Sequence, residues 1–452
     1  MARFVLSLAL VLSSALAAQA DDKNAFDPTG YWTGAVVREG SVLPVSVTIE
    51  RTLTGFEAET LFQDWYFYKP NAREPAELTD NGLVIRDFLS GDAVLRLEPR
   101  FEQLIGHIGD EEGDRSLHLK RSPPPPAPMI ESADIHFGSL DGTRLSGTLT
   151  LPLDGEALGA MVMVRGRGCA SRVNGRARFF ARYGMAVLTY DKRGAGQSEG
   201  DCATFDHDDL TDDALAALDV LAAQDRVDAQ KVGFFAESAG AWTVQAATER
   251  RLDMPESVQP AFIVTWIGPA TSILQQQISS AETYGAGIGL TPDQRTVLAE
   301  ATEIIADESL SGDAAFAKLD VIRRNAEAEG WLDRGFGPDD IPRSRDEMDG
   351  LWLRRFRYDP GTFFARAGDL PYLSVLGAKD TIVPVRENAE RLRRDLPKAR
   401  IHIVDEAGHG YDHDGQRLPV GGGESMWVFE GPDEGFTVET IRFLREIGIM
   451  SR

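Results

Sequence analysis

The chain has 452 residues, of which 42% are hydrophobic and 26% are charged. This composition is typical of globular proteins, and the length is sufficient for two or three domains. The formal charge is −24 at pH 7. So acidic a protein repels phosphate backbones and anionic membrane surfaces, which argues against nucleic acids and anionic lipids as partners.

Residues 1–20 predict a secretory signal peptide. Arg3 precedes the apolar run "FVLSLALVLSSALA", and the small residues "AQA" end at Ala20, where cleavage is expected. A membrane anchor is the alternative, but the run is short for a span, and no later segment is long and apolar enough for one. We therefore expect an exported protein, periplasmic or secreted, without a membrane span. In an oxidising compartment Cys169 and Cys202 can form a disulfide; two free thiols are the alternative.

Residues 21–121 predict an N-terminal antiparallel β domain. Segments such as "YWTGAVVREGSVLPVSVTIER" alternate apolar and polar residues around Gly and Ser. The aromatic run 65–68, "WYFY", either stacks on sugars or lipids or belongs to the core or interface of this domain. The stretch 122–128, "SPPPPAP", then predicts a stiff linker.

Residues 129–452 predict an α/β domain. A β-hairpin turning at Asp141-Gly142 is expected first. Short segments rich in β-forming residues then alternate with helical ones, such as 208–224, which is typical of a mostly parallel sheet flanked by helices. The strand segments are 160–164, 185–190, 231–236, 261–267, 370–377 and 400–405.

Residues 268–369 interrupt the alternation and predict a helical cap insertion. Thr291 and Gln294 form a capping box with Pro292 in the first turn, ahead of apolar residues at helical spacing. A further helix is expected over 313–329. The cap is expected to shape the acyl or alcohol pocket of a site beneath it, and a homodimer contact through the cap is the alternative.

The stretch 236–240, "AESAG", follows an apolar strand and precedes a helical segment. This context is typical of a nucleophile elbow, a tight turn that raises a serine hydroxyl above the edge of the sheet and requires small residues on either side. Ala236 stands where glycine is usual and adds one methyl group. The alternative is that Ser238 is only a small residue where a strand packs tightly against a helix.

Asp380 and His409 each follow a predicted strand near the C-terminus. A serine nucleophile needs a base, and the base needs a carboxylate that fixes its tautomer. We therefore predict a Ser238–His409–Asp380 triad at the C-terminal edge of the sheet. The sequence leaves other histidines and acids as alternatives, namely His402, His413, Asp405 and Asp412.

Two backbone N–H groups are expected to hold the oxyanion of a tetrahedral intermediate. One belongs to Ala239, directly after the serine. The other is assigned to Arg167 in the loop "RGRGCASR", where Gly166 and Gly168 permit a close approach to the substrate. An ordinary glycine turn is the alternative for this loop.

On these residues the chain resembles the α/β-hydrolase superfamily over roughly 130–450, and is most similar to bacterial secreted carboxylesterases and prolyl-oligopeptidase-like hydrolases. "VRGRG" stands for the His-Gly-x-Gly of that group, with Arg165 in place of histidine, and "YDKRGAGQSEG" is similar to another of its segments. The resemblance implies hydrolysis through an acyl-serine, without a metal or organic cofactor. It also implies that Asp191 and Arg193 brace loops, and that the loops of the two cysteines lie close enough for a disulfide.

The leading interpretation is a carboxylic-ester hydrolase acting on a small-molecule ester. A peptidase or amidase would use the same triad. The third interpretation is an exported binding protein, with a vestigial triad and an N-terminal β domain that recognises a ligand.

Overall fold

The computed structural model separates the chain into two compact units, one built mainly from residues before Pro124 and one mainly from residues after it. The described residues span 26–450, except for gaps at 39–40, 63–71, 80–81, 89–90, 99–101, 110–114, 124–129, 157, 203–204, 337–340, 349–356, 411, 414–416, 422–423, 428–430 and 433. The predicted signal peptide, the aromatic run 65–68 and most of the proline-rich linker lie outside these residues.

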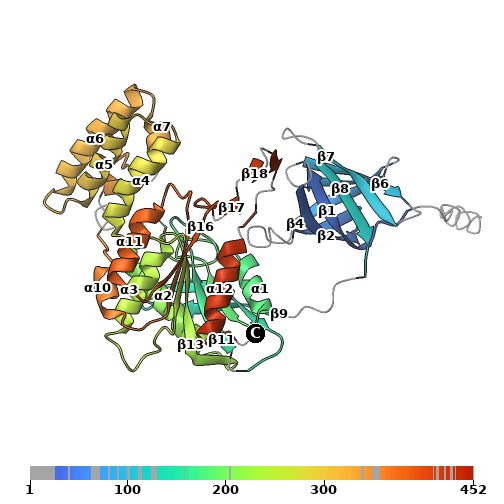
Figure 1. The fold of residues 1–452 in the computed structure, drawn as a ribbon, viewed down its shortest axis with the longest axis horizontal. Helices are drawn as coiled ribbons and strands as arrows, with labels where there is room; N and C mark the ends of the chain where they lie inside the picture. The colour runs from blue at the N-terminus through green and yellow to red at the C-terminus, as the bar shows by residue number, and fades with distance from the viewer. Residues whose placement is uncertain are drawn as a thin grey trace, which may run out of the picture. The chain divides into compact units, whose positions relative to one another are not determined.

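The first unit is a closed antiparallel barrel of eight strands, which confirms the predicted β domain (Figure 1). Inward-facing apolar side chains such as Trp32, Leu83 and Leu117 are fully buried. The strands are β1 Gly30–Arg38, β2 Ser41–Arg51, β3 Phe56–Phe62, β4 Ala72–Thr79, β5 Gly82–Phe88, β6 Gly91–Glu98, β7 Gln103–Gly109 and β8 Arg115–Arg121. Pairing of β1 with β8 closes the barrel and leaves no free edge.

The second unit contains an eight-stranded sheet in the order β16-β15-β14-β13-β11-β12-β10-β9. The antiparallel hairpin β9–β10 turns at Gly142, which has a φ of +88°. The six strands β11 to β16 are parallel and correspond to the six predicted segments. The strands are β9 Ile130–Gly138, β10 Arg144–Pro152, β11 Leu158–Val164, β12 Ala186–Tyr190, β13 Val227–Glu237, β14 Ile263–Trp266, β15 Tyr372–Gly377 and β16 Arg400–Val404.

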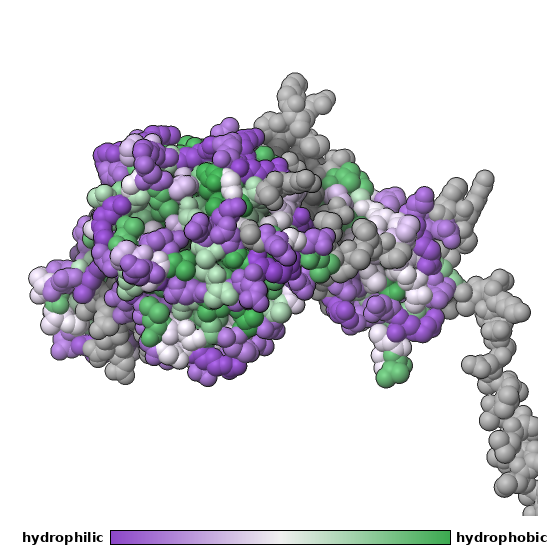
Figure 2. Space-filling model, turned by 90° about the horizontal axis from the view of Figure 1, so that it is seen from below, coloured by the Kyte–Doolittle hydropathy of each residue, from purple (hydrophilic) through white to green (hydrophobic). Residues whose placement is uncertain are grey.

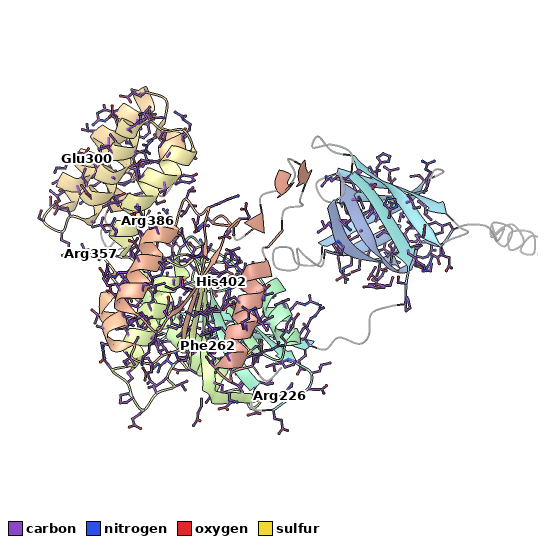
Figure 3. All side chains as sticks on the ribbon, in the orientation of Figure 1. Arg226, Phe262, Glu300, Arg357, Arg386 and His402 are labelled. Carbon is purple, nitrogen blue, oxygen red and sulfur yellow. A yellow bond between two sulfur atoms is a disulfide. The ribbon has the colours of Figure 1, made fainter. Side chains whose placement is uncertain are left out.

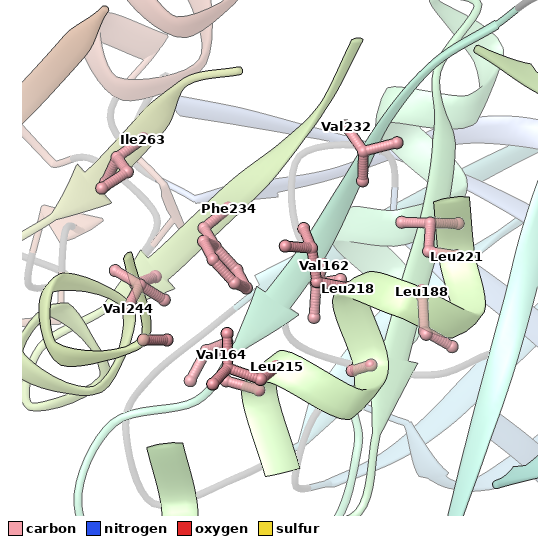
Figure 4. Close-up of a cluster of buried hydrophobic side chains, with 14 of the residues drawn as sticks. Val162, Val164, Leu188, Leu215, Leu218, Leu221, Val232, Phe234, Val244 and Ile263 are labelled. Carbon is pink, nitrogen blue, oxygen red and sulfur yellow. The ribbon is translucent and has the colours of Figure 1, made fainter. Parts of the chain in front are cut away.

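Helices cover both faces of this sheet, as Figure 1 shows. One face buries Phe180 of α1 and Phe436 of α12 against the sheet. The other face packs against four helices and includes Phe234, Leu218 and Val244, which are labelled in Figure 4. The first face carries α1 Gly175–Arg182 and α12 Glu434–Glu446, and the second α2 His207–Ala222, α3 Gly240–Arg251, α10 Gly361–Arg366 and α11 Val385–Asp395. Because both faces are covered, the central strands are almost entirely apolar.

The helical cap is inserted between β14 and β15 and has an apolar core of its own. Its helices are α4 Ile273–Gly287, α5 Pro292–Ala306, α6 Gly312–Ala328, α7 Leu332–Gly335 and α8 Arg345–Met348. The predicted capping box of Thr291 and Gln294 is confirmed at the start of α5. Phe363 and Phe364 of α10 pack into the core beside the main sheet. The cap core is therefore shorter than the predicted insertion 268–369.

Two short antiparallel pairs lie between β16 and α12. They are β17 Asp412–His413 with β20 Gly431–Pro432, and β18 Arg417–Gly421 with β19 Glu424–Trp427. None of the described helices is both long and apolar enough to cross a bilayer. The face drawn in Figure 2 is largely hydrophilic, with hydrophobic side chains in small scattered areas, as the charge of the chain leads one to expect.

Candidate active site

Ser238 lies in a sharp turn between β13 and α3. Its φ is +48°, a left-handed conformation that is rare for a residue with a side chain and costs on the order of 1–3 kcal/mol. Two hydrogen bonds hold the turn: Ser238 N–H donates to the carbonyl of Trp266 at 3.0 Å, and the Ser238 carbonyl accepts from Ala241 N–H at 2.9 Å. The backbone is thus strained at the one residue for which the nucleophile elbow requires it.

The residues two places before and after Ser238 show why the turn needs small side chains. A Cβ at Gly240 would lie 2.7 Å from the carbonyl oxygen of Val164 and 2.9 Å from that of Arg165. Ala236 is fully buried between two neighbouring strands, where it keeps the regular pairing with Val164 and Thr265. The sheet therefore accommodates the extra methyl group at 236, whereas any side chain at 240 would displace backbone.

His409 lies between Ser238 and Asp380. Its Nε2 is 3.0 Å from Ser238 Oγ, and its Nδ1 is 2.8 Å from Asp380 Oδ2. A carboxylate can only accept, so Nδ1 carries the proton and Nε2 presents a lone pair to the serine hydroxyl. The predicted side chains, from three separate strand ends, thus meet in the order that proton transfer from a serine requires.

Asp380 is fixed from behind by backbone. Its Oδ1 accepts hydrogen bonds from the N–H groups of Ile382 and Val383, both at 2.8 Å. The Asp380 side chain is 1% exposed, whereas that of His409 is 24% exposed. The carboxylate is therefore shielded from water and held in one rotamer, while the imidazole stays accessible to a substrate.

Gly377 allows the loops of the acid and the histidine to touch. A Cβ at Gly377 would lie 2.4 Å from the carbonyl oxygen of Ala407. The N–H of Lys379 donates to that same carbonyl at 3.0 Å, so the two loops are directly bonded. The distance between Asp380 and His409 depends on this contact.

The other candidate bases and acids have different positions. His402 lies within β16, where Figure 3 labels it. Asp405 is exposed in the turn that follows this strand. The side chains of Asp412 and His413 lie outside the described residues.

The loop after β11 lies against the nucleophile. A Cβ at Gly166 would stand 3.0 Å from Ser238 Cβ and 3.6 Å from its Oγ. Arg167 is exposed in this loop. Ala239 is the N-cap residue of α3, where helix N–H groups point outward and the helix dipole favours negative charge. Of the two predicted oxyanion residues, Ala239 thus directly follows Ser238, and Arg167 directly follows Gly166, which lies against Ser238.

The loop 166–170 is fastened to the segment after β12. Cys169 and Cys202 are joined by a disulfide, with their Cα atoms 5.6 Å apart. The ammonium of Lys192 donates to the carbonyls of Gly166 and, at 3.2 Å, Gly168. The disulfide is compatible with an oxidising compartment, and export of the chain stays a prediction.

The neighbours of Lys192 brace other loops, as the resemblance implies. Asp191 accepts from Arg172 N–H at 2.7 Å and from its guanidinium at 2.6 Å. Arg193 donates to both carboxylate oxygens of the fully buried Asp213, at 2.6 and 3.0 Å. Arg193 also donates to Asp141 Oδ2 of the hairpin at 3.0 Å, so its ion pairs hold the hairpin and α2 at the sheet edge.

Glu237 and Arg176 form a buried ion pair directly behind the nucleophile, and neither residue belongs to a predicted site. The Arg176 guanidinium also lies 5.6 Å from the centre of the Trp266 ring. Arg165, half-buried, lines a small recess together with these two residues. The parallel pairing of β11 with β13 brings the start of α1 to the end of β13, so no local sequence pattern predicts this pair.

The first cap helix is hydrogen-bonded to the loop that carries Asp380. Gln276 donates to the carbonyl of Ile382, and Thr283 donates to the carbonyl of Thr381. Both carbonyls belong to the two residues that follow Asp380, so the position of α4 and the position of the acid are linked through this stretch of backbone.

A comparison with known families matches part of this unit. Residues 155–300, which include β11 to β14, Ser238 and the first cap helix, match the family described as serine aminopeptidase, S33. The matched segment contains the loop after β11, the strained serine turn and four of the six parallel strands. The second unit has the α/β-hydrolase fold, a mostly parallel sheet flanked by helices.

Individual relatives of the hydrolase unit are distant. A stretch of 140 residues is 31% identical to the thiohydrolase AneE of Aspergillus aculeatus, which covers 30% of this chain and 43% of that protein. The chain therefore spans less than half the length of this curated relative. Among solved structures, the α/β-hydrolase GrgF of a Penicillium species is 17% identical, covering 71% of this chain and all of that one, with a TM-score of 0.44. An esterase of Pyrococcus furiosus is 16% identical, covering 70% and 90%, with a TM-score of 0.42.

Proposed function

We propose that the hydrolase unit cleaves carboxylic esters through an acyl-serine intermediate. The observation that carries the proposal is the continuous pair of contacts from Ser238 Oγ to His409 Nε2 at 3.0 Å and from His409 Nδ1 to Asp380 at 2.8 Å. A serine hydroxyl is a weak nucleophile until a base removes its proton, and this arrangement supplies the base with its orienting carboxylate.

In the first half-reaction, Ser238 Oγ attacks the ester carbonyl carbon while its proton passes to His409 Nε2. The carbonyl oxygen becomes an oxyanion, which the N–H groups of Ala239 and Arg167 stabilise. When the tetrahedral intermediate collapses, His409 gives its proton to the departing alkoxide, and an alcohol leaves. Asp380 stabilises the imidazolium throughout and stays ionised.

In the second half-reaction, a water molecule attacks the acyl-serine while His409 takes one of its protons. Collapse of the second tetrahedral intermediate returns that proton to Ser238 Oγ and releases the carboxylic acid. His409 accepts and then returns the proton that moves in each half-reaction, so the chain's own residues account for every proton transfer.

A thioester is the second candidate substrate, because the curated relative is a thiohydrolase. The third is a peptide or amide, because the matching family is described as a serine aminopeptidase. The three differ in the leaving group, since a thiolate leaves without protonation, an alkoxide benefits from it and an amine requires it.

The test measures hydrolysis of p-nitrophenyl butyrate, butyrylthiocholine and alanine p-nitroanilide by the wild type and by Ser238→Ala. We expect p-nitrophenyl ester turnover that is lost in the variant. A preference for the thioester or the anilide would replace the ester assignment by the corresponding one. Turnover of none of them, with a serine that does not react with a fluorophosphonate, would favour a binding protein.

A further inference from the structure

Lys192 is a buried lysine whose side chain donates hydrogen bonds to two carbonyl groups of one loop. It is 5% exposed, and its ammonium donates to the carbonyl oxygens of Gly166 and Gly168. Its backbone N–H donates to the carbonyl of Ala170 at 3.2 Å. Burial of an ammonium costs free energy unless hydrogen bonds replace its water. Loop 166–170 supplies at least three of the contacts that hold this residue.

The orientation of one peptide unit follows from the first of these contacts. The described part of the chain has no cis peptide bond, and in a trans peptide the C=O and the N–H point in opposite directions. Because the Gly166 carbonyl faces the Lys192 ammonium, the N–H of Arg167 faces away from it. Gly166 is also the residue that lies against Ser238. The peptide between 166 and 167 thus has its carbonyl held by a cation and its N–H directed to the opposite side.

We propose that Lys192 is a positioning residue for the oxyanion hole. It holds the peptide unit 166–167 with the N–H of Arg167 directed at the oxyanion, and its positive charge stabilises the negative charge that develops on the far side of that peptide. The inference rests on the proposed acyl-transfer function, because it assigns Lys192 a role only in the tetrahedral state.

The disulfide gives the loop a second attachment that does not depend on Lys192. Cys169 is bonded to Cys202, and its neighbour Gly168 has a φ of +87°, so the path of the loop after residue 167 has a constraint of its own. Removal of the ammonium should therefore release the orientation of one peptide unit rather than the whole loop.

The experiment compares Lys192→Met and Lys192→Arg with Lys398→Met, a matched control at an exposed lysine that pairs with Asp369. The measured quantities are kcat and KM for p-nitrophenyl butyrate, the Ki of an alkyl trifluoromethyl ketone, and the rate at which a fluorophosphonate labels Ser238. A trifluoromethyl ketone forms a tetrahedral adduct, so its Ki reports the oxyanion hole.

We expect Lys192→Met to lower kcat by about 100-fold with KM changed less than about twofold, the pattern of a lost oxyanion donor. The Ki of the ketone should rise by a similar factor, and Lys192→Arg should recover most of the loss because it keeps charge and donors. Lys398→Met should match the wild type. If Lys192→Met does not fold, Lys192→Gln, which keeps a donor without the charge, is expected to lose about tenfold in kcat.

An unchanged kcat in the folded variant would overturn the role of Lys192, and so would a fall in kcat without a parallel rise in the ketone Ki. Equal labelling rates for wild type and variant would also overturn it while leaving the proposed function standing. A wild-type Ser238 that the fluorophosphonate does not label would overturn both.

Discussion

Replacement of Asp380 by asparagine should force His409 into the wrong tautomer, because two backbone N–H groups fix the orientation of the side chain at 380. In the wild type, Asp380 Oδ1 accepts from two backbone N–H groups and Oδ2 accepts from His409 Nδ1. An asparagine amide has one oxygen and one NH2 group. The two N–H donors require the oxygen on their side, so the NH2 group must face His409. Nδ1 then becomes the acceptor, the proton moves to Nε2, and the lone pair that should receive the Ser238 proton is lost.

The size of the effect follows from the loss of the base while the oxyanion hole and the pocket remain. We expect Asp380→Asn to lower kcat by about 10³- to 10⁴-fold, which corresponds to about 4–5.5 kcal/mol of transition-state free energy. The fold should be retained, because the side-chain volume is nearly unchanged and both backbone donors keep their acceptor.

The assay is steady-state hydrolysis of p-nitrophenyl butyrate, with circular dichroism and thermal unfolding as checks on folding. Asp405→Asn is the matched control, because Asp405 is exposed and lies close to the same histidine in sequence. A folded Asp380→Asn variant that retains more than about a tenth of the wild-type kcat would refute the argument, as would an equal loss in the control.

Three further predictions concern the loops and the core of the hydrolase unit. Gly377→Ala should lower kcat by about tenfold or more because its methyl group would meet the carbonyl of Ala407. A kcat of this variant equal to that of the wild type would contradict the prediction. Burial lowers the pKa of His207 to about 4, so the unfolded chain binds the proton first as the pH falls below about 6.5. Between about pH 7.5 and pH 5, the free energy of unfolding measured in urea should therefore fall by about 2 kcal/mol more in the wild type than in His207→Phe. An equal fall in both proteins would contradict the assignment. A double Cys169→Ser, Cys202→Ser variant should lower the free energy of unfolding by about 2–4 kcal/mol, since the bond closes a 33-residue separation; an unchanged urea midpoint would contradict it.

Local rules in the sequence account for most of the elements. The capping box of Thr291 and Gln294 and the Asp141-Gly142 turn depend on residues within a few positions of one another, and both are confirmed. The six parallel strands were predictable because burial on both faces makes them short apolar runs. Closure of the N-terminal barrel was not, because it depends on β1 pairing with β8 across the whole domain.

The candidate site shows the same division. The sequence predicts Ser238 because a strained turn requires small neighbours, and it predicts Asp380 and His409 because both follow strand ends. Lys192 and the Arg176–Glu237 pair carry no such pattern, because their partners lie far away in sequence. Their contacts exist only once the parallel sheet has aligned its strand ends at one edge.

The most direct test of the account is to trap the acyl group. The wild type would be mixed with p-nitrophenyl butyrate, quenched with acid within the first turnover and digested for mass spectrometry. The account predicts a single butyryl group on the peptide that contains Ser238, and none in Ser238→Ala. Release of p-nitrophenol by the wild type with no acylated Ser238 peptide, or with the group on another residue, would contradict it.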